Sequence, residues 1–301
     1  MIEFSNLKNS VIVRLNGGLG NQMFQYAAGL ALAESKKKSL YLDLSLLKFS
    51  KFQYQLNNFN LPQNSLINND VVSDTPRKLL EKFNKKFGWI HEKFTGIYYE
   101  RNFDYSDNIF SINKDVIVLN GYFQSPLYFS HIEEIIRKRF LLTVSHSEDF
   151  KYWAAKIFDS KNSVALHIRR GDYLSEGALL VHGLLDKNYY ERALQLISKI
   201  IGSDLNIFIF SDDHKYASYL FKNIPRLNFV KTSDVTHCED MFLMSQCNHN
   251  IIANSTYSWW GAWLNKNKNK HVIAPAQWFT SSFLKSTNVL NLFPNDWILL
   301  K

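Results

Sequence analysis

The second half of the chain alternates short apolar runs with longer amphipathic stretches. Ser163–Ile168, Leu205–Phe210 and His249–Ala253 are apolar along most of their length, which is typical of strands buried on both faces of a parallel sheet. The stretch from about 187 to 201 carries its apolar residues at helical spacing. Strands that alternate with helices in this way predict parallel β-α-β units with right-handed crossovers.

The first half begins with the same pattern and then loses it. Val11–Leu15 and Leu40–Leu44 are expected strands, and the expected helix between them, Gln22–Ser35, follows a glycine-rich turn. From about residue 51 to residue 120 polar stretches alternate with aromatic residues and the period is weak, although Thr75–Phe87 is compatible with a helix. A chain of 301 residues with these two halves predicts an α/β protein of two domains, residues 1–155 and 156–301.

A polar cluster follows each of three separate strands in the second half. The clusters are His167–Asp172, Ser211–Asp213 and Asn254–Ser258. The carboxyl ends of parallel strands share one edge of the sheet, and ligands of open α/β sheets bind in the crevice at that edge. The three clusters are therefore expected to converge on one binding site.

The two adjacent arginines of the first cluster indicate the kind of ligand. Arg169 and Arg170 carry permanent positive charge at the end of a buried strand, and a guanidinium forms two-pronged hydrogen bonds to phosphate oxygens. This predicts a diphosphate pocket with Arg169 as the phosphate ligand. The other arginine is then expected to pair with Asp172 or Asp213 as a structural brace. His167 lies on the side of Arg169 and fits a packed core histidine and a ligand contact equally well.

The remaining polar residues each have a structural and a ligand-binding interpretation. Asp212 and Asp213 either contact ribose or a purine edge or brace the arginines. Asp240 either sits in the first turn of a helix or accepts the two N–H groups of a guanine edge. Asn254–Ser258 supplies either an N-cap or donors for phosphate. Gly17–Gly20 matches neither a dinucleotide fingerprint nor a Walker loop, so it is either a tight turn or a set of N–H donors.

The net charge of the chain indicates which kinds of molecule it binds. The formal net charge of +8 and the pI near 9.2 favour anionic partners. The lysines stand in short, scattered runs and no recognised aromatic nucleic-acid motif is present, so we expect no nucleic-acid partner. The positive charge is also compatible with a peripheral contact to an acidic membrane surface.

Cysteine content and hydropathy indicate the compartment. Cys238 and Cys247 are too few for a disulfide framework, which predicts a reducing compartment, and with His237 and His249 they match no zinc-binding spacing. The sequence does not open on a signal peptide, and no apolar run approaches the roughly 20 residues of a spanning helix. We therefore expect a cytoplasmic protein. Peripheral attachment to the inner membrane face is the alternative that stays open.

Four segments taken together point to a known family. They are Gly17–Tyr26, His167–Tyr173, Phe210–Asp213 and Ile251–Gly261. In order and spacing they resemble the bacterial α-1,2-fucosyltransferases of glycosyltransferase family 11 over almost the whole chain, with a loose match over about 51–115. The resemblance implies a GT-B-type fold, in which two Rossmann-like domains face a cleft, the first on the acceptor side and the second binding GDP-fucose.

The resemblance also implies a reaction. Fucose would pass from GDP-β-L-fucose, with inversion, to the 2-hydroxyl of a terminal galactose in a glycan of the surface-polysaccharide or O-antigen type. No Asp-x-Asp pair occurs, and two arginines can supply the counter-charge to a diphosphate, so neither a metal nor a cofactor is expected. Two alternatives stay open: an α-1,6- or protein-directed fucosyltransferase with the same donor, and a non-catalytic GDP-sugar-binding protein.

Residue roles follow from the motifs by position. The resemblance implies Arg169 at the pyrophosphate and His167 and Asp240 at the guanosine. The full set expected to bind GDP-fucose is Gly18, Gly20, Asn21, Gln22, His167, Arg169, Arg170, Asp172, Asp212, Asp213, Asp240, Asn254, Ser255, Thr256, Tyr257 and Ser258. The expected catalytic residues are Arg169 and two candidate general bases in the following loop, Glu176 and His182.

Overall fold

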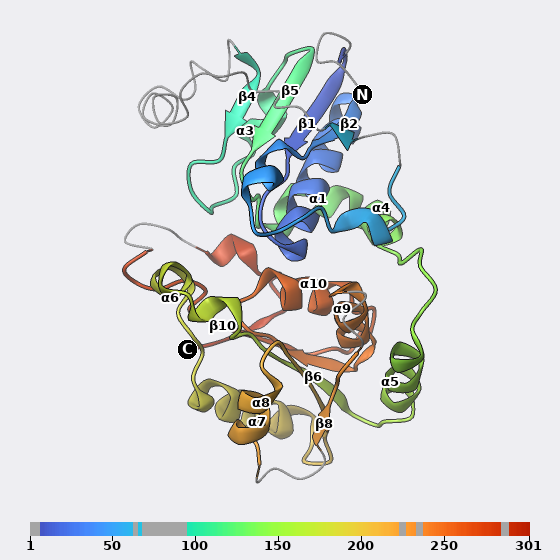
Figure 1. The fold of residues 1–301 in the computed structure, drawn as a ribbon, viewed down its shortest axis with the longest axis vertical. Helices are drawn as coiled ribbons and strands as arrows, with labels where there is room; N and C mark the ends of the chain where they lie inside the picture. Colours follow the sequence, from blue (N-terminus) through green and yellow to red (C-terminus); the bar gives the residue numbers. More distant parts are fainter. Residues whose placement is uncertain (1–6, 63–65, 68–94, 223–226, 233–236, 284–288) are drawn as a thin grey trace. The chain divides into compact units, whose positions relative to one another are not determined.

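The computed structural model describes residues 7–62, 66–67, 95–222, 227–232, 237–283 and 289–301. The helix expected over Thr75–Phe87 lies outside these residues. The chain forms two compact units, each with its own parallel sheet (Figure 1). Residues 1–143 and 287–293 make up the first unit, and 144–286 and 294–301 the second. Helix α5 (Glu148–Phe158) belongs wholly to the second unit and contains residue 155. The domain division expected at residue 155 stays a prediction.

The sheet of the first unit has the strand order β3-β2-β1-β5-β4, and its described strands are all parallel. The strands are β1 (Ser10–Arg14), β2 (Ser39–Asp43), β3 (Leu66–Ile67), β4 (Ile97–Tyr99) and β5 (Val116–Asn120). The helices are α1 (Leu19–Lys36), α3 (Asn108–Ser111) and α4 (Glu133–Arg139). Single 3-10 turns cover Ser45–Phe49, Leu56–Asn58, Pro126–Tyr128, Ser130–Ile132 and Leu290–Leu292. Strands β1 and β2 confirm the two strands expected at the start of the chain.

Helix α1 is buried along most of its length and lies close against β1 at Gly29. Ala27, Ala28 and Ala31 have no exposed surface. A Cβ added to Gly29 would lie 2.2 Å from the side chain of Val13, so this position requires glycine. The helix begins at Leu19, directly after the N-cap residue Gly18, which is three residues before the expected start.

The sheet of the second unit is parallel with the order β11-β10-β9-β6-β7-β8. The strands are β6 (Ser163–Ile168), β7 (Asn206–Ser211), β8 (Leu227–Phe229), β9 (His249–Ile251), β10 (Val272–Pro275) and β11 (Ile298–Leu300). The helices are α5, α6 (Glu176–His182), α7 (Lys187–Ile201), α8 (His214–Leu220), α9 (His237–Gln246) and α10 (Thr256–Leu264), with a 3-10 turn at Asp172–Leu174. The regular alternation of strands and helices predicted from the apolar runs is confirmed.

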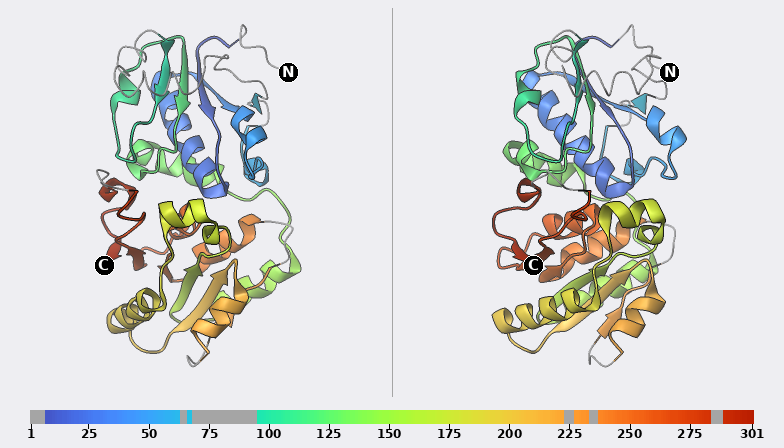
Figure 2. Two further views of the ribbon diagram at one scale, coloured as in Figure 1. Left: turned by 60° about the vertical axis from the view of Figure 1, so that its left-hand side comes forward. Right: turned by 90° about the vertical axis from the view of Figure 1, so that its left-hand side faces the viewer.

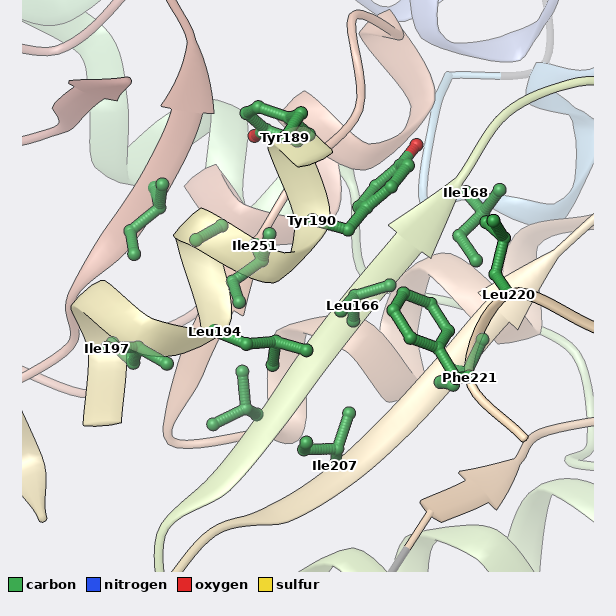
Figure 3. Close-up of a cluster of buried hydrophobic side chains, with 14 of the residues drawn as sticks. Leu166, Ile168, Tyr189, Tyr190, Leu194, Ile197, Ile207, Leu220, Phe221 and Ile251 are labelled. Atoms are coloured by element: carbon green, nitrogen blue, oxygen red, sulfur yellow. The ribbon is translucent and has the colours of Figure 1, made fainter. Parts of the chain in front are cut away.

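Helices cover both faces of this second sheet (Figure 2). On one face, residues of β6 such as Leu166 and Ile168 pack with Tyr190 of α7 and with Leu220 and Phe221 at the end of α8 (Figure 3). The intervening residues of β6 point to the other face, as the alternation of a strand requires. There the ring of His167 lies 5.8 Å from that of Tyr257 in α10, and Trp153 of α5 meets Phe208 of β7.

The chain reverses its direction across the second sheet at β6. From β6 it runs outward through β7 and β8, and it then returns to the other side of β6 for β9, β10 and β11. The carboxyl ends of β6 and β9 therefore flank a topological switch point, where open α/β sheets bind their ligands.

Candidate active site

Arg169 follows β6 directly, at the switch point, and lies between two carboxylates. Its Nη2 is 2.6 Å from Oδ1 of Asp172, and its Nη1 is 2.9 Å from Oδ2 of Asp212, while a quarter of its side chain stays exposed. The guanidinium lies 5.6 Å from the ring centre of Tyr173. Its Nε is buried without a hydrogen-bond partner among the described residues. Arg169 thus retains one donor that the protein does not use.

Arg170 is a structural brace. Its Nη1 donates to Oδ2 of Asp213 at 2.7 Å, and its guanidinium lies 4.1 Å from the ring centre of Tyr216. Asp213 also caps α8, because its Oδ1 accepts from the backbone N–H of Tyr216 at 3.0 Å. These two hydrogen bonds to the carboxylate lower the pKa of Asp213. The backbone N–H of Arg170 donates to Asp212 at 2.9 Å, which fixes the start of the loop.

Charge at this edge of the sheet is nearly balanced. Two guanidinium groups meet three carboxylates, those of Asp172, Asp212 and Asp213, so the group as a whole carries one net negative charge. The anionic partners that the adjacent arginines require are therefore provided by the chain itself. A diphosphate bound here has to displace a carboxylate from Arg169 or draw on other donors as well.

His167 is a packed, neutral histidine. Its side chain is 4% exposed, and its Nδ1 has no hydrogen-bond partner within the described part of the chain. Burial, together with the charge of Arg169, lowers its pKa to about 3, so the imidazole is uncharged at neutral pH. Such a ring can meet a base or sugar only as a neutral hydrogen-bonding group.

Other donors stand at the start of α10, after the short loop that follows β9. The helix begins at Thr256, and the side chain of its N-cap residue Ser255 makes no capping hydrogen bond. The first turn of a helix leaves N–H groups without partners inside the helix and carries the positive end of the helix dipole. This helix terminus is therefore compatible with a phosphate ligand.

Several predicted ligands in the same segment make hydrogen bonds within the protein. The amide of Asn254 donates to the backbone oxygens of His182 at 2.8 Å and Trp278 at 3.3 Å. The hydroxyl of Tyr257 accepts from the backbone N–H of Met241 at 3.0 Å. Ser258 is fully buried, and its hydroxyl donates back into its own turn. These contacts hold α6, α9 and α10 together at the edge of the sheet.

The start of α9 contributes one predicted residue and one that sequence analysis did not single out. Asp240 accepts from the hydroxyl of Thr232 at 2.8 Å. Its neighbour Glu239 is 1% exposed and accepts from both the backbone N–H and the hydroxyl of Ser147, at 2.8 and 2.6 Å. The sequence signal for Glu239 was its place beside Asp240 in the first turn of the same helix.

The structure separates the two candidate bases. The ring of His182 stacks on that of Tyr173 at 4.6 Å, and Tyr173 in turn lies beneath the guanidinium of Arg169. Burial lowers the pKa of His182, which favours the neutral, proton-accepting form. Glu176 begins the same helix α6 but is exposed. His182 is therefore part of the cluster around Arg169, whereas Glu176 lies at its surface.

The predicted residues of the first unit surround the start of α1. Gly18 is the N-cap and Gly20 lies in the first turn. Gln22 is fully buried; its amide nitrogen donates to the backbone oxygens of Gly17 and Gln53, and its amide oxygen accepts from the N–H of Gln55. Gln22 thus fixes the loop after β2.

Asn21 and Asp43 are also engaged in the first unit. The side-chain oxygen of Asn21 accepts from Gln124 at 3.0 Å. Asp43, the last residue of β2, forms a buried ion pair with Arg14 at 3.1 Å. A ligand role for the α1 turn stays a prediction.

Metal and membrane features can be described only within the same ranges. No group of three or more His, Cys, Asp or Glu side chains in the described residues is placed to hold a metal ion, and metal independence stays a prediction. Cys238 and Cys247 are buried thiols, and neither forms a disulfide bond within the described residues. Among the helices that the structure describes, none combines the length and the apolar character needed to cross a bilayer.

Comparisons with known sequences place the chain in a family of glycosyltransferases. The sequence model described as Glycosyl transferase family 11 matches residues 3–301. The O-antigen biosynthesis glycosyltransferase WbnK of Escherichia coli is 35% identical over 95% of this chain and 99% of its own length. An alpha-1,2-colitosyltransferase of Escherichia coli is 32% identical over 97% of this chain and 99% of its own.

Among solved structures, the NodZ alpha-1,6-fucosyltransferase soaked with GDP-fucose is similar with a TM-score of 0.51. The match covers 85% of this chain and 92% of that chain, at 16% sequence identity. At this identity the similarity shows the fold alone. It confirms the expected α/β fold of GT-B type with two parallel sheets.

Proposed function

Because this chain belongs to glycosyltransferase family 11, we propose that it transfers L-fucose from GDP-β-L-fucose to the 2-hydroxyl of a terminal galactose. The observation that carries the proposal is the position of Arg169, at the end of β6 and beside the strand that leads into α10. A glycan of the O-antigen type is the proposed acceptor, which the role of the relative WbnK supports.

The donor diphosphate is proposed to bind between Arg169 and the first turn of α10. Arg169 offers its Nε, which lacks a partner within the described residues, and exchanges a carboxylate partner for a phosphate oxygen. The partner released is one of the two aspartates, Asp172 or Asp212, and the other stays paired with Arg169. The positive end of the α10 dipole then attracts the second phosphate.

The chemistry follows from where charge develops. The bond between C1 of fucose and the diphosphate oxygen breaks, and both its electrons leave with GDP. The acceptor 2-hydroxyl oxygen forms the new bond to C1 from the opposite face, which inverts the configuration. Donors already fixed at the diphosphate bind it more strongly as its negative charge grows, which lowers the barrier.

The proton of the acceptor hydroxyl needs a destination. We assign it to His182, because the neutral imidazole stacks on Tyr173 beside Arg169. General-base assistance of this kind contributes typically about 10²–10⁴-fold. Glu176 is the second candidate, since it lies one helix length earlier on α6.

GDP-colitose is a second donor to compare with GDP-fucose, because one relative with 32% identity is an alpha-1,2-colitosyltransferase. Colitose is fucose without its 3-hydroxyl. A site that hydrogen-bonds this hydroxyl discriminates strongly against the deoxy sugar, whereas a site that does not contact it accepts both. Measuring kcat/KM for GDP-fucose and GDP-colitose with one acceptor decides between the donors, and NMR of the product decides between an α-1,2 and an α-1,6 linkage.

The site assignment is tested by Arg169→Ala. This variant is expected to lose transfer to galactosides by at least about 100-fold, because two charge-assisted hydrogen bonds to the diphosphate are lost. The measurement is product formation from GDP-fucose and lactose, with folding checked by circular dichroism.

The matched control is Arg137→Ala, which removes a guanidinium that pairs with Glu133 on α4, within the first unit. It is expected to retain wild-type activity. Full transfer by Arg169→Ala, in a folded protein, would remove the basis of the proposal. Absence of any turnover by the wild-type chain would favour a non-catalytic GDP-sugar-binding protein.

A further inference from the structure

A small polar pocket lies within the first unit, at the carboxyl end of β4. Its volume is about 210 Å³. Its lining includes Tyr98, Glu100, Arg101, Asp104, Tyr105 and Asn108, and we call it the β4 pocket. It is smaller than the roughly 300–1,000 Å³ that drug-sized ligands occupy, so its size suits a single ring rather than a nucleotide.

The lining favours a neutral, hydroxyl-rich ligand. The lining holds two acidic residues and one arginine, so it carries no net positive charge that would attract an anion such as phosphate. Carboxylate, amide and hydroxyl groups together supply both acceptors and donors, which is what a polyol needs. Tyr98 and Tyr105 add aromatic surface for the apolar face of a ring.

One carboxylate oxygen in the β4 pocket lacks a donor. Oδ1 of Asp104 is buried and has no hydrogen-bond partner in the part of the chain that the structure describes. A buried acceptor without a partner costs free energy unless a ligand or water satisfies it. The hydroxyl of a bound sugar is a donor that fits this position.

Glu100 connects the β4 pocket to the rest of the first unit. Its two carboxylate oxygens accept from the backbone N–H groups of Tyr122 at 2.6 Å and Phe123 at 2.9 Å. Only glycine fits at 121, since a Cβ there would lie 2.3 Å from Cβ of Glu100. The turn that Glu100 holds continues to Gln124, whose amide donates to Asn21 in α1.

We infer that the β4 pocket binds one sugar ring of the glycan acceptor, with Asp104 and Glu100 accepting hydrogen bonds from its hydroxyl groups. This inference rests on the proposed function, because it takes the ligand to be a saccharide acceptor. Through the turn at 121–124, the ring is connected to the glycine-rich start of α1, which the sequence motifs single out.

The test combines Asp104→Asn with direct binding of sugars to the full chain. Calorimetry and saturation-transfer NMR use lactose, N-acetyllactosamine and galactosyl-β-1,3-N-acetylgalactosamine as probes. Asp104→Asn is expected to weaken binding of the best probe about tenfold and to raise its KM as acceptor by the same factor. The affinity for GDP is expected to stay at the wild-type value.

Two further variants make the result specific. Asn108→Ala removes a second lining group, and it is expected to weaken sugar binding even if Asp104→Asn does not fold. Asp107→Asn changes an exposed carboxylate outside the lining, and it is expected to leave sugar binding and acceptor KM unchanged.

The outcomes separate this inference from the proposed function. Unchanged sugar affinity in both folded lining variants would overturn the inference, and so would the absence of sugar binding to the wild-type chain. Loss of sugar affinity in both variants supports it, whatever the donor assay shows. Full transfer by Arg169→Ala would instead count against the donor site alone, because Arg169 belongs to the other unit.

Discussion

Arg169 and Arg170 are adjacent in the sequence but differ in what holds them. Arg170 pairs with a carboxylate that also caps α8, so its position is tied to the helix. Arg169 pairs with Asp172 and Asp212 and keeps a donor nitrogen without a partner among the described residues. Partly exposed ion pairs of this kind contribute little to stability, so an incoming phosphate can replace one at small cost.

The sequence predicted part of this arrangement. It placed Arg169 at a strand end, and it expected an aspartate to brace the other arginine, which Asp213 does for Arg170. It did not predict that Asp172 and Asp212 both hold Arg169, because the choice among neighbouring carboxylates depends on side-chain rotamers at the sheet edge. The sequence also could not predict that Oδ1 of Asp104 lacks a hydrogen-bond donor among the described residues, because a local sequence pattern does not show which acceptors are satisfied.

Glu100 leads to a prediction about stability and pH. Burial raises its pKa from 4.5 to about 7, although the two backbone N–H groups oppose the shift. Between these values the folded protein binds more protons than the unfolded chain, so the free energy of unfolding falls as pH rises from about 4.5 to 7. The contribution is on the order of 3 kcal/mol.

Comparing the wild-type chain with Glu100→Gln isolates this effect. Urea unfolding at pH 5 and pH 8 is expected to show the variant gaining stability relative to wild type at the higher pH. His167 has a lowered pKa and acts in the opposite direction, but it is present in both proteins and cancels in the difference. An unfolding difference that is the same at both pH values would contradict the pKa of Glu100.

At the scale of elements, the strands that lie in clear apolar runs were predictable, and the elements without such a run were not. Strands β6, β7 and β9 follow the apolar runs, because both of their faces are covered. Helix α5 was missed, since only Phe150 and Ile157 of its eleven residues are buried and no extended apolar stripe results. Strands β3 and β4 lie in the stretch where the period is weak, so no apolar run marked them, whereas the equally short β9 stands within a longer apolar run.

The start of α5 depends on one hydroxyl. The Ser147 side chain accepts from the N–H of Phe150 at 3.1 Å and donates to the buried carboxylate of Glu239 in α9. Ser147→Ala removes the helix cap and leaves Glu239, among the described residues, with only the backbone N–H of residue 147. We expect this variant to lose about 1–3 kcal/mol of unfolding free energy.

Chemical denaturation measures that loss, and Ser160→Ala provides the control. The hydroxyl of Ser160 donates to the carbonyl of Lys156 at the exposed end of the same helix. It is expected to change stability by less than about 0.5 kcal/mol. If both variants unfold at the same denaturant concentration, the bond between Ser147 and Glu239 does not stabilise the second unit.

On the scale of the whole molecule, both units place polar clusters at the carboxyl edge of a parallel sheet. Arg169 marks that edge in the second unit and the β4 pocket marks it in the first. The sequence predicted two α/β halves from their periodicity. It did not predict that residues 287–293 return to the first unit, where Ser125 bonds to the backbone of Asn291, because such a return depends on contacts between distant residues.

The central claim is that Arg169 holds the diphosphate of the donor without a metal ion. The most direct measurement is calorimetric titration of GDP into the wild-type chain and Arg169→Ala, each with EDTA and with Mg²⁺. We predict the same GDP affinity for the wild type in both buffers and a loss of about 100-fold in the variant. Equal affinity of variant and wild type, or wild-type binding that appears only with Mg²⁺, would contradict the account.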